Sequence, residues 1–235
     1  MLIKTLRRED LPSKVFEVCL RLKAIEAQPV IVGGWVRDRL MGLPPQASTD
    51  IDIEVFHISF EDLQQLFSRE SHVDFPKFGV LRLDYVDLSL PRIERCTGRK
   101  YNDFSVQIEP NLSFEEAGKR RDFTVNAIGW NPLTKKLLDP FFGVRDIEEK
   151  LLRPITIAFM EDSYRILRAA QLIARFDFTP APQLLEFGER MSCEKLSPKH
   201  IQNTKIVLES ALYKGKALQF LQKIQWLSVV DAMGA

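Results

Sequence analysis

A pair of aspartates on a predicted β-strand constrains this chain more than any other feature. The pair lies in the stretch VGGWVRDRLMGLPPQASTDIDIEVF, which runs from Val32 to Phe56. Asp50 and Asp52 are two residues apart, so their side chains point to the same face of the strand. Adjacent carboxylates among apolar neighbours are costly unless a positive charge pairs with them. The pair therefore predicts a divalent cation bound between the two side chains.

Magnesium is the cation that this pattern favours. Mg²⁺ takes hard oxygen ligands and uses few protein carboxylates, with substrate phosphates completing its shell. A pair of such ions can lower the pKa of an attacking hydroxyl and stabilise a leaving pyrophosphate. A further carboxylate is expected from a neighbouring strand, where Asp87 is the better candidate and Asp84 the weaker one. The alternative is that these acids lie on the surface of an edge strand.

Two glycines precede the aspartates at a predicted strand-to-helix junction. Gly33 and Gly34 let the backbone approach a ligand, and the helix that follows presents free N–H groups suited to phosphate. Arg37, one turn into that helix, adds a guanidinium for the same oxygens. Strand–Gly–Gly–helix turns are also common as purely structural features. The two glycines therefore indicate a phosphate-binding site only in combination with the acidic strand that follows them.

The composition is that of an ordinary globular protein. The 235 residues are 45% hydrophobic and 28% charged, with a formal net charge of +1. A balance this close to neutral argues against general polyanion binding, although a local basic cluster can still hold a nucleic acid. The 3 cysteines are far apart and fit neither a disulfide framework nor a zinc site. With no signal-peptide pattern and no apolar run of membrane-spanning length, we expect a cytoplasmic protein without membrane contact.

The hydrophobic patterning predicts a mixed α/β part followed by helices. Helices are expected over residues 12–27, 35–42, 59–70 and 113–130, and strands over residues 28–34, 51–58, 78–92 and 105–110. The charged stretch 93–104 is predicted to be a mobile loop. From residue 162 the pattern is helical, apart from breaks at 179–182 and 197–198. The predicted fold class is therefore α+β, with a change near residue 140.

Four motifs, in this order, resemble those of the class II tRNA nucleotidyltransferases. The similarity covers about residues 30–178, and its motifs are GGWVRD…DIDIEVF, KRRDFTVNAIGW, DPFFGVRDIEEKLLRPI and EDSYRILRAAQLIARF. That family contains the CCA-adding enzymes and the bacterial poly(A) polymerases, and it belongs to the polymerase-β-like nucleotidyltransferase superfamily. The resemblance implies a polymerase-β-like head with a small mixed sheet and helices, followed by helical neck, body and tail domains.

The resemblance also divides the chain. It implies a nucleotidyltransferase head, or palm, domain over residues 1–140, and an all-helical neck with a partial body over residues 141–235. The sequence ends at Ala235, soon after a stretch that resembles the early body helices. The tail domain that holds the tRNA elbow in that family is expected to be absent. We therefore expect a truncated chain, a naturally short enzyme, or one that needs a second polypeptide to supply the tail.

The second motif is predicted to bind the ribose of a nucleotide. A helix over KRRDFTVNAIGW would put Asp122 and Asn126 on one face, with Arg121 beside them. A carboxylate and a guanidinium can grip ribose hydroxyls there, and Asn126 can reach a triphosphate oxygen. In the resembled family this motif selects ribonucleotides over deoxyribonucleotides. The alternative is a surface Arg–Asp ion pair, which contributes little.

The fourth motif is predicted to recognise the base. Asp162, Arg165 and Arg168 recur every three residues and form one helix face. An Asp and an Arg present acceptors and donors that match a base edge, and a wrong base leaves them unpaired. The resemblance implies that Asp162 and Arg165 act as the template for CTP or ATP, with Arg168 contacting the nucleotide. The alternative is an ordinary ion pair on a helix surface. Gln171 stands where many relatives carry another arginine, and the sequence offers no physical reason for it.

One basic segment matches the flexible loop of the resembled family in position. It contains Arg92, Arg95, Arg99 and Lys100. In that family the loop helps the site to change from CTP to ATP. The alternative is a solvated loop without a role in the reaction.

These features together predict a template-independent RNA nucleotidyltransferase that adds CMP and AMP to the 3′ end of tRNA. Asp50 and Asp52 would hold two magnesium ions, and Asp87 would help to activate the RNA 3′-hydroxyl. That hydroxyl attacks the α-phosphorus of CTP or ATP as pyrophosphate leaves. Enzymes that add only CC or only A, and poly(A) polymerases, share most of these motifs and stay open as alternatives. A nucleotide-binding fragment that is inactive without a tail or partner chain is a further alternative.

Overall fold

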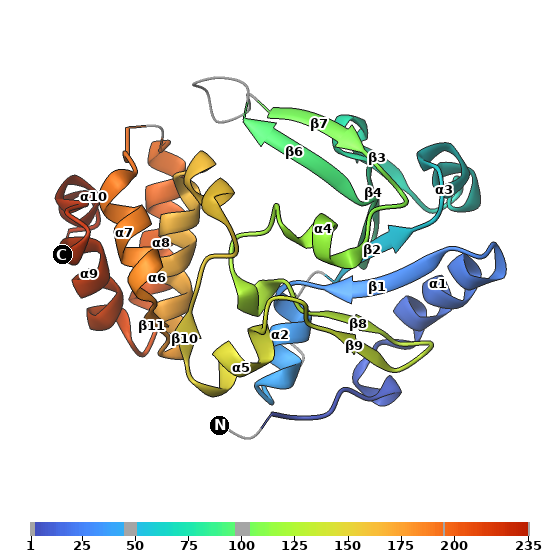
Figure 1. The fold of residues 1–235 in the computed structure, drawn as a ribbon, viewed down its shortest axis with the longest axis horizontal. Coiled ribbons are helices and arrows are strands. Elements are labelled where there is room, and N and C mark those ends of the chain that lie inside the picture. Colours follow the sequence, from blue (N-terminus) through green and yellow to red (C-terminus); the bar gives the residue numbers. More distant parts are fainter. Residues whose placement is uncertain (1–2, 45–50, 97–103, 195, 235) are drawn as a thin grey trace.

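The computed structural model describes residues 3–44, 51–96, 104–194 and 196–234. A mixed sheet with its helices lies at the right of Figure 1, and a group of helices from the C-terminal part lies at the left. The α+β class that the patterning predicts is confirmed. Within the described ranges, no helix is both long and apolar enough to span a bilayer.

The sheet has seven strands in the order β3-β4-β5-β2-β1-β8-β9. In chain order their bounds are β1 (Gln28–Val32), β2 (Ile51–Phe56), β3 (His72–Phe75), β4 (Val80–Leu83), β5 (Val86–Ser89), β8 (Gly129–Asn131) and β9 (Lys136–Leu138). Strands β2 and β5 pair in parallel, and the other neighbours are antiparallel. The β4–β5 pair is the hairpin that the alternating pattern over residues 78–92 allows.

Helices cover both faces of the central strands, which explains why β1 is buried along most of its length. The helix α1 (Ser13–Ala24) adds Leu22 to the main core, which includes Ile31 of β1. The short helix α4 (Phe114–Gly118) adds Ala117 to a smaller cluster that includes Val30. Because neighbouring residues of a strand point to opposite faces, the two helices lie on opposite sides of β1.

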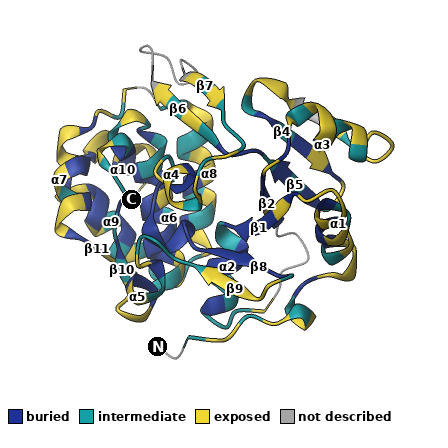
Figure 2. Cartoon of the chain, turned by 45° about the vertical axis from the view of Figure 1, so that its right-hand side comes forward, coloured by how far each residue is buried: buried dark blue, intermediate teal, exposed yellow. Residues whose placement is uncertain are grey.

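The C-terminal part is helical, as predicted. Its elements are α5 (Gly143–Glu148), α6 (Tyr164–Phe176), α7 (Pro182–Arg190), α8 (Pro198–Glu209), α9 (Lys214–Lys223) and α10 (Leu227–Ala232), with β10 (Leu151–Leu152) paired to β11 (Thr179–Pro180). Both predicted breaks are confirmed, because a proline stands in the first turn of α7 and of α8. Figure 2 shows that buried residues concentrate along α6, which the other helices surround.

One hydrophobic core joins the sheet to the helices. It contains residues from Leu11 to Met233. At the junction, the rings of Phe123 and Phe159 lie 5.3 Å apart between centroids, and those of Phe159 and Phe187 lie 6.1 Å apart. The division of the chain at residue 140 stays a prediction.

The predicted helix over residues 113–130 is wrong beyond Gly118. Residues 119–122 form a turn and a bend, and Phe123 forms an antiparallel β-bridge with Pro154. Around this bridge the amide of Thr124 donates to the carbonyl of Arg153 (3.1 Å), and that of Ile155 to the carbonyl of Asp122 (3.3 Å). A short 3-10 helix, η3 (Thr124–Asn126), follows. Long-range backbone pairing therefore overrides the local helical pattern.

The predicted loop over residues 93–104 is wrong at both ends. Strands β6 (Arg92–Cys96) and β7 (Phe104–Ile108) form an antiparallel hairpin that projects from the sheet (Figure 1). Residues 97–103, with Arg99 and Lys100, lie outside the described residues. The prediction treated the charged residues as a sign of a loop. They are strand residues, and their side chains alternate between the two faces of the hairpin.

A substitution at Gly143 tests the packing between α5 and η3. A Cβ built there would lie 2.2 Å from the backbone carbonyl oxygen of Thr124. Gly143→Ala is therefore expected to lower the free energy of unfolding by about 1–3 kcal/mol, measured by urea denaturation.

Gly215→Ala is the matched control, because a Cβ at Gly215 meets nothing within 4 Å. It lies in α9, where alanine is the better helix former, so stability should be unchanged or rise by up to about 1 kcal/mol. Equal stability of the two variants would contradict the close contact at Gly143.

Candidate functional site

A cavity of about 770 Å³ lies between the sheet and α6. Most of the predicted site residues line it, namely Gly33, Gly34, Arg37, Asp52, Arg92, Arg121, Asp122, Asn126, Asp162, Arg165 and Arg168. Asp87 and Arg95 are not among its lining residues. Asp50, Arg99 and Lys100 lie outside the described residues. The structure thus gathers residues from segments far apart in the chain around one space.

The turn between β1 and α2 (Gly34–Leu40) passes close to Asp52. Gly33 has φ 77° and ψ −145°, a combination that is essentially restricted to glycine. A Cβ at this position would lie 3.2 Å from Oδ2 of Asp52. Val32, just before the turn, is the register partner of Asp52 in the antiparallel β1–β2 pair. The glycine is therefore required both by the backbone conformation and by the carboxylate beside it.

The carboxylate predicted to come from a neighbouring strand lies next to Asp52. In the parallel β2–β5 pair, Asp52 and Asp87 are register partners, so their side chains point to the same face. Arg82 holds Asp87, with Nε and Nη2 each donating to one carboxylate oxygen at 2.8 Å. The weaker candidate, Asp84, is exposed and lies 3.8 Å from His72. The pairing therefore favours Asp87 over Asp84 as a neighbour of Asp52.

The donor set at Asp52 fits magnesium in its chemistry. In the part of the chain that the structure describes, no group of three or more His, Cys, Asp or Glu side chains is placed to hold a metal. Magnesium needs no such group, because one or two carboxylates and substrate phosphates satisfy it. Asp52 offers one carboxylate at the cavity wall. The binding of two ions stays a prediction.

A chain of charged and polar side chains crosses the cavity floor from α2 to α6. Arg37, which is 5% exposed, donates from Nε to Asp38 (2.8 Å) and from Nη1 to Oδ1 of Asn126 (2.5 Å). Asn126 donates from Nδ2 to Oδ1 of Asp122 (3.0 Å). Asp122 accepts at Oδ2 from Nε of Arg168 (2.7 Å). The turn of η3 therefore brings Asp122 and Asn126 together, as the wrongly predicted helix would have done.

The charges in this chain depend on one another. Burial alone would raise the pKa of the Asp122 carboxyl, but the charge of Arg168 and the hydrogen bonds from Asn126 and Arg168 lower it below its ordinary value. Burial lowers the pKa of the Arg37 guanidinium, and the charge and hydrogen bond of Asp38 oppose this effect. Asp122 is therefore an ionised acceptor at neutral pH, held by a cation from another part of the fold.

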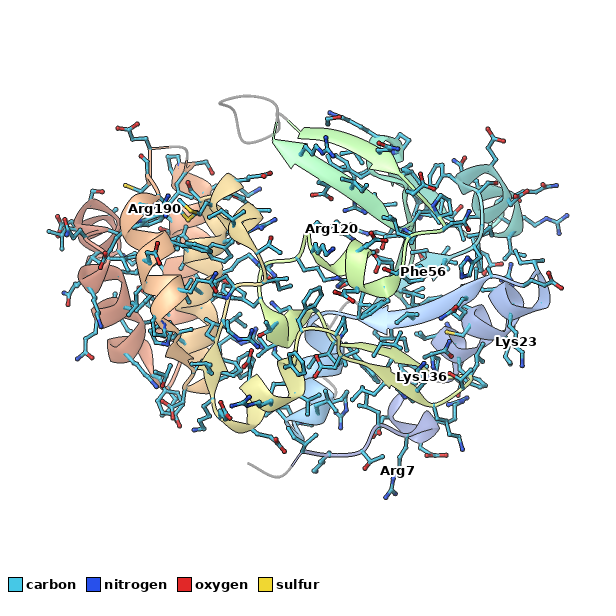
Figure 3. All side chains as sticks on the ribbon, viewed as in Figure 1. Arg7, Lys23, Phe56, Arg120, Lys136 and Arg190 are labelled. Carbon is cyan, nitrogen blue, oxygen red and sulfur yellow. The ribbon has the colours of Figure 1, made fainter. Side chains whose placement is uncertain are left out.

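A buried glutamate that the sequence analysis did not identify binds two arginines of the cavity wall. Glu54, on β2, is 0% exposed and accepts from Nη2 of Arg120 (2.8 Å) and Nη2 of Arg121 (3.0 Å). Arg120 lies at the centre of the molecule (Figure 3) and approaches Glu94 of β6 at 3.8 Å. Burial raises the pKa of Glu54, but the charges of Arg121 and Arg120 and their hydrogen bonds bring it below its ordinary value.

The signal for Glu54 was present in the sequence. In DIDIEVF, the glutamate continues the alternation of acidic and apolar residues, so it lies on the same face as Asp52. Its partners could not be found in this way, because they lie more than sixty residues later in the chain. Arg121, the predicted ribose ligand, thus uses one of its donors on Glu54.

The predicted base-recognition residues lie on one wall but not all on the helix. Asp162 precedes α6 and accepts at Oδ1 from the amide of Tyr164 (2.9 Å), so it caps the first turn. Arg165 donates to the carbonyls of Ala158 (3.1 Å) and Arg120 (2.8 Å). These contacts fix the direction of both side chains toward the cavity that they line.

The hairpin supplies one more lining arginine. Arg92 donates from Nε to Glu94 (2.6 Å) and from Nη1 to the carbonyl of Phe78 (3.1 Å). Arg92 lies in β6 and is bound on two sides. The resemblance instead implied that it belongs, with Arg95, to a flexible loop. Whether the hairpin has the role of a flexible loop stays a prediction.

Gln171 now has a structural role. Its side-chain amide donates from Nε2 to Oγ1 of Thr204 at 2.8 Å, and Thr204 is buried in α8. The residue thus ties α6 to α8 while its side chain lines the cavity without a charge.

The sequence matches the family of the poly A polymerase head domain over residues 30–153. Relatives include the multifunctional CCA protein of Stenotrophomonas maltophilia strain R551-3, which is 35% identical over 201 residues, or 83% of this chain and 48% of that protein. The multifunctional CCA protein of Paracidovorax citrulli is 41% identical over 170 residues, covering 70% of this chain and 39% of that protein. The chain thus spans about half the length of the curated relatives it matches, or less.

Solved structures share the fold. The CCA-adding enzyme of Bacillus stearothermophilus in complex with CTP superposes with a TM-score of 0.70 at 24% identity, covering 88% of this chain and 50% of that one. A tRNA-processing enzyme with CTP gives a TM-score of 0.66 at 26% identity, covering 92% of this chain and 57% of that one. These likenesses confirm the predicted head fold.

Removal of the charge of Glu54 is expected to destabilise the fold. Glu54→Gln removes the carboxylate that Arg120 and Arg121 share, and loss of one partner from a buried ion pair costs about 3–5 kcal/mol. Because the pKa of Glu54 is lowered in the folded state, its stabilisation is present above the ordinary Glu pKa of about 4.3 and is lost as the pH falls through the lower folded value. Urea denaturation should therefore show a large gap between wild type and variant at pH 7 that narrows in acid.

Glu149→Gln is the control for this comparison. Glu149 forms an exposed pair with Arg145 (2.8 Å), and exposed pairs of this kind contribute little to stability because solvent screens them. A Glu54→Gln gap that is as small as this control, or that stays constant with pH, would contradict the assignment of a buried ionised carboxylate.

Proposed function

The chain belongs to the family of the poly A polymerase head domain, and on that basis we propose that it transfers nucleotides from CTP and ATP to the 3′ end of tRNA, adding or repairing CCA. The multifunctional CCA proteins that it resembles, and the CTP complexes of its structural neighbours, support this choice of reaction. Pyrophosphate is the second product. The chain covers about half of the first of those relatives.

One observation supports this function most. Asp52, beside the Gly33 turn, borders the same cavity as the polar chain from Arg37 to Arg168. A carboxylate for a metal, a guanidinium for phosphates and an ionised acceptor for hydroxyls thus border one space of about 770 Å³. A nucleoside triphosphate needs these three kinds of group at once.

The reaction is a phosphoryl transfer, in which positioning and charge neutralisation supply most of the rate. Asp50 and Asp52 would hold magnesium, which supplies charge neutralisation and a lower pKa for the attacking hydroxyl when it is bound. Asp87, oriented by Arg82, would accept the proton of the RNA 3′-hydroxyl or help to orient that group. Its place beside Asp52 in the strand register supports this role.

Nucleotide binding would be divided among the other lining residues. Gly33, Gly34, Arg37 and Asn126 would hold the triphosphate, with Arg37 already fixed by Asp38. Arg121 and Asp122 would hold the ribose. The ionised state of Asp122 supports this role, because a carboxylate accepts hydrogen bonds from sugar hydroxyls.

Base selection would fall to Asp162, Arg165 and Arg168. Asp162 and Arg165 would present an acceptor and donors to the base edge, and Arg168 would contact the nucleotide from the same wall. A wrong base would leave these groups unpaired, which gives strong discrimination. Enzymes that add only CC or only A would use the same residues, so the products of the reaction decide among these activities.

Substitution of Asp52 tests the reaction directly. With magnesium, CTP and ATP, the wild-type chain should extend tRNA ending before CCA, in C or in CC, as read by gel electrophoresis. Asp52→Ala should reduce the rate by about a hundredfold or more, because a metal ligand is lost. A chelator added to the wild type should abolish addition.

Asp84→Asn is the matched control, because Asp84 is an exposed acid on the hairpin that carries Asp87. It should leave addition unchanged. Products that stop after CC, or that contain only A, would identify a specialised enzyme, and a long A tail a poly(A) polymerase. Binding of CTP and ATP without any addition would instead point to a fragment that needs a tail or partner chain.

A further inference from the structure

Arg175 differs from the other arginines that line the cavity in the described part of the chain. The others donate to protein acceptors: Arg37 to Asp38, Arg92 to Glu94, Arg120 and Arg121 to Glu54, Arg165 to two carbonyls, and Arg168 to Asp122. The side chain of Arg175, in the last turn of α6, makes no hydrogen bond or ion pair with any described residue. Its donors are therefore available to a ligand in the cavity.

The guanidinium of Arg175 is nevertheless held in place. Its Cζ lies 4.6 Å from the centroid of the Phe176 ring. The Cζ of Arg37 lies 4.7 Å from the same centroid. One aromatic ring thus bears two guanidinium groups, one from the head and one from the helical part. Cation–π contacts of this kind orient a guanidinium without occupying its N–H donors.

Of the two guanidinium groups, one pairs with a described carboxylate and the other does not. Asp38 pairs with Arg37, whereas no described carboxylate pairs with Arg175. The charge of Arg175 is among the influences that lower the pKa of the Arg37 guanidinium, after burial, so the two groups interact electrostatically. Like charges on one wall repel each other. An anion in the cavity that binds both guanidinium groups would offset this repulsion and accept hydrogen bonds from the donors of Arg175.

The rest of the α6 wall supports the same location for an anion. Arg168, Gln171 and Arg175 follow one another at helical spacing and all line the cavity. Arg168 is neutralised by Asp122, and Gln171 is uncharged and bound to Thr204. Of these three residues, Arg175 is therefore the one whose positive charge no described carboxylate pairs with.

We propose that Arg175, together with Arg37, forms a phosphate-binding site at the C-terminal end of α6. A guanidinium binds phosphate through parallel N–H donors, and it does so best when its plane is fixed in advance. The proposal rests on the proposed function for the source of the phosphate, which is either the triphosphate of the nucleotide or the backbone of the RNA. Both sources offer the same chemical group to Arg175.

Binding measurements with Arg175→Gln test the site. Isothermal titration of the full chain with inorganic tripolyphosphate, CTP and a short RNA ending in CC is compared at one ionic strength. The variant should bind at least one of these ligands about tenfold more weakly than the wild type, since a charge-assisted contact is lost. Arg175→Lys should fall between the two, because it keeps the charge and loses the fork.

Arg190→Gln is the matched control. Arg190 lies in α7, away from the centre of the molecule (Figure 3), where it pairs with Glu186 at 3.2 Å. It is not among the lining residues, so its variant should bind all three ligands as the wild type does. Weaker binding by both variants to the same extent would overturn the proposal, because it would reflect general electrostatic attraction.

The ligands separate the two sources of phosphate. Weaker binding of tripolyphosphate and CTP by Arg175→Gln would assign the site to the nucleotide, and weaker binding of RNA alone would assign it to the RNA backbone. If Arg175→Gln binds all three ligands with wild-type affinity, the proposed phosphate site is overturned. That result would not contradict the proposed nucleotide addition. Conversely, Arg175→Gln could bind polyphosphate more weakly while the wild-type chain adds no nucleotide. This pair of results would support the site and contradict the proposed function.

Discussion

The ion pair between Asp122 and Arg168 is the interaction on which the cavity depends. Asp122 comes from the head segment and Arg168 from α6, so the pair joins the two walls across the space between them. Asp122 is buried, and separation of the walls would leave its charge without a partner. The Arg168 side chain is 45% exposed, so solvent screens the pair, and loss of one partner costs less than the about 3–5 kcal/mol of a fully buried pair. The same carboxylate orders Asn126 and, through it, Arg37, so one contact fixes groups on several elements.

Patterns of short range predicted most of the fold. The hydrophobic patterning located the strands around Asp52 and the first helix, and the Pro residues of α7 and α8 marked real breaks. The helix after Gly118 failed because residues 122–124 pair with residues 153–155, a contact that no local pattern reveals. The prediction of a loop over residues 93–104 failed for a different reason. Charged residues of this segment are stabilised in the folded hairpin, as for Arg92, which donates to Glu94 of the same strand and to the carbonyl of Phe78, so their charge did not indicate a loop.

The sequence predicted which residues line the site, but it did not predict which side chains bind one another. The motifs identified Asp122, Arg165 and Arg168 as cavity residues, which the structure places on its wall. They did not show that each is held by another part of the protein. Glu54 illustrates the difference, because its place in the alternation was visible while its two arginine partners were not. Side-chain pairing across long sequence distances needs the fold before it can be stated.

The continuous hydrophobic core has a consequence for cooperativity. Residues from Leu11 to Met233 belong to one cluster, and the rings of Phe123, Phe159 and Phe187 carry it across the junction. Unfolding of the sheet would therefore expose apolar residues of the helices that pack against it. Loss of either half exposes the apolar surface of the other, so the heat-capacity change of unfolding belongs to the whole chain. The walls of the cavity thus persist or disappear together, as a single thermodynamic unit.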